Sequence, residues 1–190
     1  MNNVDPSKAR RSRIFLLLIA FVFAAPMIAA GLLTYTGWQP GVKGNGLPIT
    51  PQRNFADENL RVRLESGQLW LWRDSEPRLT LIALAGPDCA ARCFDVLTGL
   101  AKARVMLNRN QSRLRLLYLG APPVDAARRT AMKTFWNLGN DVDNKLADYR
   151  PTTPDSVSVI LVESDGVALS RYPEGFDGPG VLRDLQKVIK

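Results

Sequence analysis

The stretch that decides the fold is residues 79–93, which read LTLIALAGPDCAARC. A continuous apolar run over residues 79–85 is typical of a central strand that is covered on both faces. Beyond Cys93, apolar side chains recur with helical spacing as far as Met106. The two cysteines of the chain, Cys89 and Cys93, therefore lie where a buried strand passes into a helix.

The same patterns, followed outward from this junction, predict the remaining elements. The predicted strands are residues 60–64, 69–72, 79–85, 114–119, 157–162 and 167–172. Gly67 marks the turn of an N-terminal β-hairpin, and Asp165-Gly166 suits a two-residue hairpin turn later in the chain. Further helices are predicted over residues 125–149, as one helix or two with a break at Gly139, and over residues 179–189.

These elements follow the order ββ, then β-α-β-α-β-β-α. This order, with cysteines at the first strand-to-helix junction, predicts an α/β, thioredoxin-like fold. We expect a central mixed sheet flanked by helices, with an N-terminal β-hairpin, preceded by one transmembrane helix.

A second strong feature lies at the N-terminus, where residues 14–36 carry no charge. About 20 apolar residues span a bilayer as a helix. Four basic residues precede the run, namely Lys8, Arg10, Arg11 and Arg13. The positive-inside rule therefore places the N-terminus in the cytoplasm. A cleaved signal peptide is the alternative, although the run is longer than a usual signal-peptide core. Both readings export the residues that follow.

The predicted organisation has four parts. Residues 1–13 form a basic cytoplasmic tail, 14–36 the transmembrane helix, 37–56 a tether rich in Gly and Pro, and 57–190 the thioredoxin-like periplasmic domain. The usage of proline, arginine and alanine suggests a bacterium, so we expect the anchor in the inner membrane. In such an oxidising compartment, thiol pairs form disulfides.

Composition excludes several functions. The chain contains no histidine, which removes Ser-His-Asp and Cys-His catalysis and the H-E-x-x-H metal site. The net charge is +7, and the first 13 residues supply +3 of it. No cluster of arginines and aromatics points to a nucleic acid as a partner. The chemistry of the chain is therefore expected at its two thiols.

The residues leave three interpretations of Cys89 and Cys93 open. They form a redox-active pair, with Cys89 attacking and Cys93 resolving; they bind Cu(I), with a third ligand from a partner; or they are a static disulfide or inert core thiols. Unpaired N–H groups at the helix start favour a thiolate, and low thiol pKa values are common in this setting. Arg92 would add to this effect, whereas Asp88 would oppose it.

The C-x-x-x-C spacing and the single N-terminal anchor resemble the SCO/SenC family of membrane-anchored, copper-handling proteins. The segment GNGLPITP at residues 44–51, the strand-turn-strand ending RYP at 171–173 and the LRDL helix at 182–185 fit the same resemblance. It implies a role in the assembly of cytochrome c oxidase, with oxidase subunit II or a copper chaperone as partner and Cu(I) as a possible cargo.

The chain departs from this family in two ways. Phe94 stands where the family motif continues with proline, and the family's copper-binding histidine is missing. Asp155 or Ser156 stands in the corresponding loop, and a carboxylate is a poorer Cu(I) ligand than imidazole. The family's two-cysteine, one-histidine copper site therefore cannot form from this chain alone. The alternative function is a non-catalytic anchored adaptor that binds oxidase subunits or assembly factors after loss of the copper site.

Overall fold

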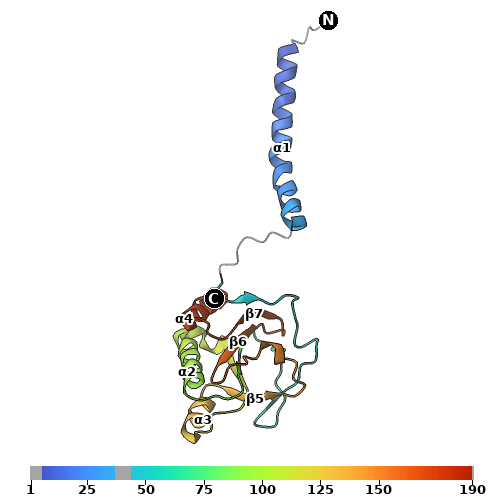
Figure 1. Cartoon of the computed structure of the whole chain (residues 1–190). Coiled ribbons are helices and arrows are strands. Elements are labelled where there is room, and N and C mark those ends of the chain that lie inside the picture. Colours follow the sequence, from blue (N-terminus) through green and yellow to red (C-terminus); the bar gives the residue numbers. More distant parts are fainter. Residues whose placement is uncertain (1–5, 37–43, 190) are drawn as a thin grey trace. The chain divides into compact units, whose positions relative to one another are not determined.

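The structure is a computed structural model that describes residues 6–36 and 44–189 (Figure 1). The chain divides into two compact units, residues 1–43 and 44–190, and each is described by itself. In the first unit, helix α1 covers Pro6–Thr36. Its segment Arg13–Tyr35 has a mean hydropathy of 2.6. With a rise of about 1.5 Å per residue, 23 residues reach about 34 Å, so α1 is long and apolar enough to span a membrane.

The second unit is built on a mixed sheet with the strand order β1-β7-β6-β3-β4-β5-β2. The strands are β1 Leu47–Pro48, β2 Val62–Leu64, β3 Leu79–Ala85, β4 Leu114–Leu119, β5 Asn137–Asp141, β6 Val157–Val162 and β7 Ala168–Tyr172. Neighbours β3 and β4, and β4 and β5, run parallel, while the other pairs are antiparallel. The expected central mixed sheet is confirmed, with β3 at its centre.

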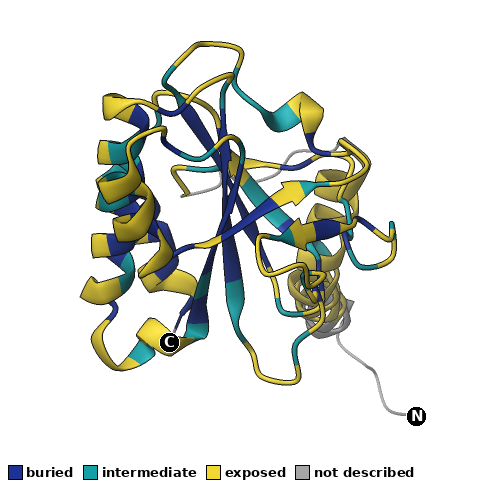
Figure 2. Cartoon of the chain, turned by 90° about the horizontal axis from the view of Figure 1, so that it is seen from below, coloured by how far each residue is buried: buried dark blue, intermediate teal, exposed yellow. Residues whose placement is uncertain are grey.

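Helices cover one face of this sheet. They are α2 Ala91–Met106, α3 Ala126–Lys133 and α4 Gly178–Val188, with the short 3-10 helices η1 Asn108–Arg113 and η2 Ala147–Tyr149 in connecting segments. Figure 2 shows α2, α3 and α4 on one side of the buried strands. Leu81 and Ala83 of β3 pack with Leu97 of α2 and Leu185 of α4 in the core on that side.

The opposite face of the sheet is covered by irregular chain rather than by helices. Ile82 and Leu84 of β3 pack there against Phe55 and Trp72. Because adjacent side chains of a strand point to opposite faces, a sheet covered on both faces needs continuous apolar strands. This accounts for the run of residues 79–85, which is apolar except at Thr80.

The helix expected over residues 125–149 is wrong beyond Lys133. Residues 137–141 form strand β5, which pairs in parallel with β4 and antiparallel with β2. Gly139 is therefore not a helix break but a strand residue. A Cβ atom at this position would lie 2.9 Å from the carbonyl oxygen of Arg63, so the close approach of β2 requires glycine there.

The second arm of the expected N-terminal hairpin is reduced to one bridge. Gly67 makes the turn with a φ of +86°, and Leu69 forms an isolated bridge with Arg63. The backbone N–H of Trp70 still donates to the backbone carbonyl of Val62 at 2.9 Å. The Trp72 indole N–H donates to the buried carbonyl of Leu60 at 2.6 Å, so residues 69–72 bend onto the core and do not extend the sheet.

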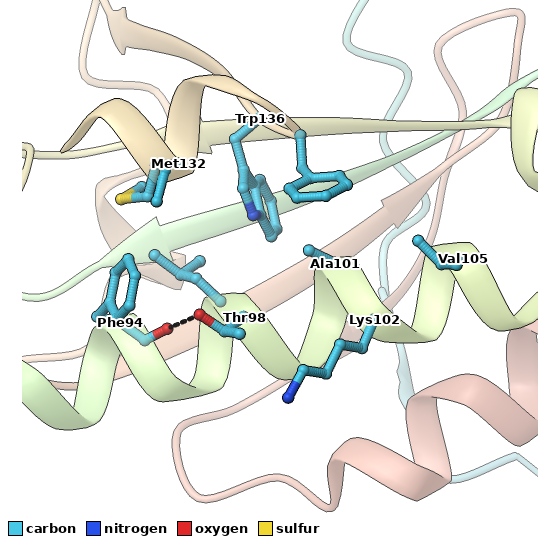
Figure 3. A pocket seen from close by; sticks show the side chains of 10 residues that line it. Phe94, Thr98, Ala101, Lys102, Val105, Met132 and Trp136 are labelled. Atoms are coloured by element: carbon cyan, nitrogen blue, oxygen red, sulfur yellow. Dashed lines mark hydrogen bonds between the residues drawn. The ribbon is translucent and has the colours of Figure 1, made fainter. Parts of the chain in front are cut away.

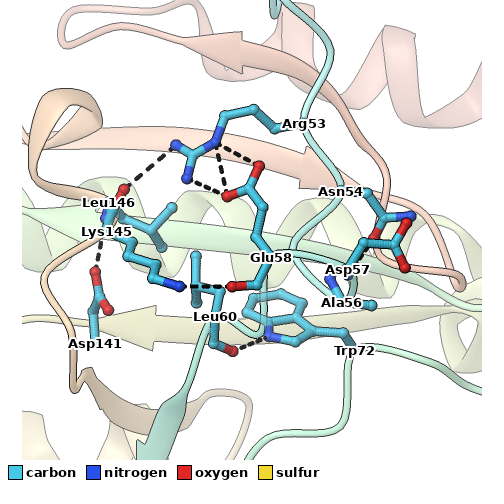
Figure 4. Close-up of polar contacts among 10 residues, drawn as sticks. All are labelled: Arg53, Asn54, Ala56, Asp57, Glu58, Leu60, Trp72, Asp141, Lys145 and Leu146. Carbon is cyan, nitrogen blue, oxygen red and sulfur yellow. Dashed lines mark hydrogen bonds and ion pairs between the residues drawn. The ribbon is translucent and has the colours of Figure 1, made fainter.

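Residues 44–56 were expected in the tether but are part of the second unit. Within them β1 pairs with β7 at the edge of the sheet, and Phe55 is fully buried. Figure 4 shows the polar contacts of residues 53–60, which follow β1 in the chain. Arg53 Nε donates to both carboxylate oxygens of Glu58 at 3.0 and 3.1 Å, and Lys145 Nζ donates to the Glu58 carbonyl at 2.6 Å. The apolar side chains of this segment supply one wall of the core.

Candidate functional site at the disulfide

Cys89 and Cys93 form a disulfide between the end of β3 and the first turn of α2. Their Cα atoms are 5.1 Å apart, inside the range of about 4.4–6.8 Å usual for bridged cysteines. Ala90, the residue directly before α2, has a non-helical backbone with φ −100° and ψ −132°. The structure therefore brings the two predicted site residues together, with the loosened first turn that the C-x-x-x-C spacing requires.

Both cysteines are buried, Cys93 more completely than Cys89. Cys89 is 7% exposed, whereas Cys93 is fully buried in the core beneath α2. A thiol group that attacks from outside can therefore reach the Cys89 side of the bridge first. The assignment of Cys89 as the attacking residue and Cys93 as the resolving residue stays a prediction.

The start of α2 is capped by a carboxylate from a distant part of the chain. Asp155 Oδ1 accepts hydrogen bonds from the backbone N–H groups of Ala90 at 2.7 Å and Cys93 at 2.9 Å. Its Oδ2 accepts the N–H of Arg92 at 2.9 Å. Three of the donors that a helix start leaves without intrahelical partners are thereby satisfied by one side chain.

The loop that carries Asp155 is held against the same junction. The Asp155 N–H donates to Asp88 Oδ1 at 2.8 Å, so the two aspartates link the two sides of the site reciprocally. Gly86 N–H donates to the Ser156 carbonyl at 3.0 Å. A Cβ on Gly86 would lie 2.5 Å from the Thr153 carbonyl oxygen, so only glycine allows the loop this close to the end of β3.

The electrostatics at the helix start differ from the sequence-based expectation. Burial raises the pKa of the Asp155 carboxyl, but its three backbone N–H donors outweigh this effect and hold the pKa below its ordinary value. Asp155 is therefore an anion at neutral pH. The N–H groups expected to stabilise a cysteine thiolate are occupied by this carboxylate, and its negative charge lies beside the disulfide.

A polar pocket of about 320 Å³ adjoins the disulfide centre. Asp155 and Arg92 line it together with Glu174. The Glu174 carboxylate accepts hydrogen bonds from Thr153 Oγ1 at 3.0 Å and Ser156 Oγ at 3.2 Å. Glu174 thus fixes the same loop from its outer side.

The residues at this centre do not fit a Cu(I) site of the kind that the resemblance implies. Both sulfurs are consumed in the disulfide, and the Asp155 carboxylate is turned toward backbone N–H groups. Within residues 6–36 and 44–189, no group of three or more His, Cys, Asp or Glu side chains is placed to hold a metal ion. Cys89 and Cys93 could serve as metal ligands only after reduction.

Sequence reasoning found the cysteines and the loop at residues 154–157, but it missed what the loop does. It considered Asp155 as a substitute for a metal ligand, whereas the structure makes it the cap of α2. The sequence carries a weak signal for this role. Ala90 and its neighbours offer no side-chain cap for α2, so the orphan N–H groups need a partner from elsewhere.

Comparison with known proteins supports the fold. Residues 79–190 match the family described as transmembrane-like, thioredoxin-like, C-terminal domain. Sco1 from Thermus thermophilus is structurally similar, with a TM-score of 0.51 and 15% identity over 77% of this chain and 97% of that one. Peroxiredoxin Q from Xanthomonas campestris has a TM-score of 0.51 and 14% identity over 76% and 100%. No curated protein matches the chain in sequence.

The structural similarities to Sco1 and to peroxiredoxin Q have equal TM-scores. At 15% and 14% identity they show a shared thioredoxin-like fold, and they do not distinguish one of these protein classes from the other as the relative of this chain.

Proposed function

Because the chain belongs to the family of transmembrane-like proteins with a thioredoxin-like C-terminal domain, we propose that it is a membrane-anchored thiol-disulfide exchange protein. Its working groups on this proposal are Cys89 and Cys93. The target is a copper-handling protein outside the bacterial inner membrane, either cytochrome c oxidase subunit II or a copper chaperone. The sequence resemblance to the SCO/SenC family supports the choice of target, and the similarity to Sco1 is compatible with it.

The observation that carries the proposal is the disulfide itself, in which Cys93 is fully buried and Cys89 retains 7% exposure. In the reduced protein, the Cys89 thiolate attacks a target disulfide, which forms a Cys89–target bond and releases one target thiolate. The Cys93 thiolate then attacks Cys89 Sγ, forming the internal disulfide and releasing the second target sulfur. The target gains two electrons, and a dithiol protein of the same compartment must reduce the pair again.

Asp155 favours this direction of electron flow. A dithiol protein becomes a strong oxidant when its reduced form is stabilised. Here the carboxylate of Asp155 occupies the N–H groups that would stabilise a thiolate. The reduced form lacks that stabilisation, so the pair gives up its electrons readily. This arrangement suits a protein that keeps target cysteines reduced.

The test uses the full chain in detergent or nanodiscs, with the oxidised soluble copper-centre domain of subunit II as probe. We expect Cys93→Ser to accumulate a mixed disulfide with the probe through Cys89, and Cys89→Ser to form none. In cells, Cys89→Ser should abolish the contribution to oxidase assembly. Full assembly activity of Cys89→Ser would contradict the proposal.

A second candidate is the non-catalytic adaptor, and the burial of the disulfide favours it. Cys93 is fully enclosed, and Cys89 is nearly so. Structural disulfides have potentials below about −300 mV, whereas exchange proteins lie between roughly −120 and −270 mV. Equilibration of the pair with redox buffers separates the two functions: a potential below about −300 mV assigns the adaptor role.

A further inference from the structure

An apolar groove opens between α2 and α3, on the helix-covered side of the domain (Figure 3). Its volume is about 280 Å³. Aliphatic and aromatic side chains dominate its walls, among them Phe94, Ala101, Val105, Met132, Phe135 and Trp136. Figure 3 shows Met132 and Trp136 pointing toward α2 across the groove. The two helices therefore diverge and leave apolar surface uncovered between them.

The apolar walls of the groove are exposed, although its floor is not. Val105 is 49% exposed and Phe135 42%, while Met132 and Trp136 are only 3% and 4% exposed. A contiguous apolar surface of this kind on a folded domain is typical of an interaction site.

The two helices that form the groove are basic, whereas the rest of the domain is slightly acidic. Helices α2 and α3 together contain six Lys and Arg and one Asp, a net charge of +5. The other residues of 44–190 contain fourteen basic and sixteen acidic residues, a net charge of −2. Lys102 lines the groove, and the Arg128 guanidinium lies 5.6 Å from the centre of the Phe94 ring. An apolar groove with a basic rim is complementary to an apolar ridge with acidic flanks.

We propose that this groove binds an amphipathic, acidic helix of a partner protein. The apolar ridge of such a helix, with side chains at i, i+3, i+4 and i+7, would fill the groove. Its acidic residues would face Lys102, Arg128 and Arg129. The concave shape favours a helix over a lipid surface, because a bilayer offers no ridge that reaches Met132 and Trp136 on the floor.

This inference does not depend on exchange by the disulfide. Phe94, at one end of the groove, follows Cys93 directly in α2, so a helix bound there would hold its parent protein beside the disulfide. The groove would serve an adaptor equally well. Loss of redox activity in Cys89→Ser should leave helix binding intact, and this separates a failure of the proposed function from a failure of this inference.

The experiment uses the full chain in neutral-lipid nanodiscs and a fluorescent two-heptad peptide with leucines at the ridge positions and glutamates on the flanks. A control peptide carries lysine in place of each glutamate. We expect the glutamate peptide to bind at least tenfold more tightly, a difference of about 1.4 kcal/mol. Its affinity should fall with added salt, because exposed charges are screened. Equal binding of both peptides would overturn the proposal.

Variants locate the binding on the surface. Val105→Glu and Phe135→Glu place a carboxylate at exposed groove positions and should weaken the glutamate peptide at least tenfold. Val188→Glu is the matched control, because Val188 is 51% exposed on α4 and does not line the groove. Unchanged binding in Val105→Glu would contradict the inference. Movement of the Met132 methyl resonance in anionic nanodiscs, without any peptide binding, would instead assign the groove to lipid.

Discussion

The most informative perturbation is Asp155→Gly, which removes the carboxylate that caps α2. Asp155 has a φ of +52°, a backbone conformation that glycine adopts without strain. The substitution therefore frees the N–H groups of Ala90, Arg92 and Cys93 without forcing the loop into a new conformation. It also removes a negative charge beside the disulfide.

The expected size of the effect follows from these contacts. A charge at a helix start interacts with the helix dipole by about 0.3–1 kcal/mol when exposed, and by up to about 2 kcal/mol when partly buried. We take about 1.4 kcal/mol for a Cys89 thiolate that gains the freed N–H groups. This stabilises only the reduced form, and about 1.4 kcal/mol corresponds to about 30 mV for a two-electron couple. The reduction potential of Asp155→Gly should therefore rise by about 30 mV.

The assay is equilibration of the full chain with dithiol redox buffers at pH 9 and pH 7. The effect requires a thiolate, and a larger share of the reduced protein carries one at pH 9 than at pH 7. The shift should therefore be smaller at pH 7. Asp125→Gly is the matched control, because Asp125 caps α3 by accepting from Ala127 and Arg128. It loses a helix cap of the same kind and should leave the potential unchanged.

Two results would refute the reasoning about Asp155. An unchanged potential at pH 9 in Asp155→Gly would mean that the freed N–H groups do not reach a cysteine thiolate. An equal rise in Asp125→Gly would mean that the loss of any helix cap changes the potential, so the position of Asp155 would have no special part in it.

Two further predictions concern the stability of the domain. Trp72→Phe removes the indole donor of the buried Leu60 carbonyl and should cost about 1–3 kcal/mol in urea unfolding. Trp70→Phe should cost clearly less, because the Trp70 indole N–H has no hydrogen-bond partner among the described residues. Equal losses would show that ring size alone matters. Burial raises the pKa of Asp184, but donors on Asn45, Lys187 and Gly46 outweigh it and lower the pKa. The stabilisation by this carboxylate should be complete above about pH 4 and lost as the pH falls through the lowered value. The urea midpoint of Asp184→Asn should thus lie below that of the wild type at pH 7 and approach it at pH 3; a gap that stays constant would exclude the carboxylate as the source.

The strands of the central sheet could be predicted from the sequence because they are buried on both faces and are therefore rich in apolar residues. Residues 79–85, 114–119 and 157–162 are apolar except at Thr80, Arg115 and Ser158, and each strand packs on both faces. Strand β5, with the sequence NLGND, carries no such pattern. Its strand conformation comes from pairing with β4 on one side and β2 on the other. Local sequence does not report such pairing, so these residues were predicted to be helical.

The position of the cysteine pair could be predicted from the sequence, whereas the capping of α2 by the Asp155 carboxylate could not. The spacing of Cys89 and Cys93 after a buried strand predicted that the two thiols lie together, with a disulfide as one of the alternatives left open. Asp155 lies 62 residues beyond Cys93, and only the pairing of β6 with β3 brings its loop to the helix start. A contact of that range depends on the folded sheet, and local sequence patterns do not report it.

The two shortest strands, β1 and β2, occupy the two edges of the sheet. An exposed strand edge is a template on which other chains can pair and aggregate. Here β1 shields β7 and contains Pro48, which has no N–H to offer a further strand. The other edge, β2, is three residues long and folds back on itself through Leu69. The N-terminal segment of the domain thus closes both edges of the sheet, which guards against edge-to-edge association of copies of the domain.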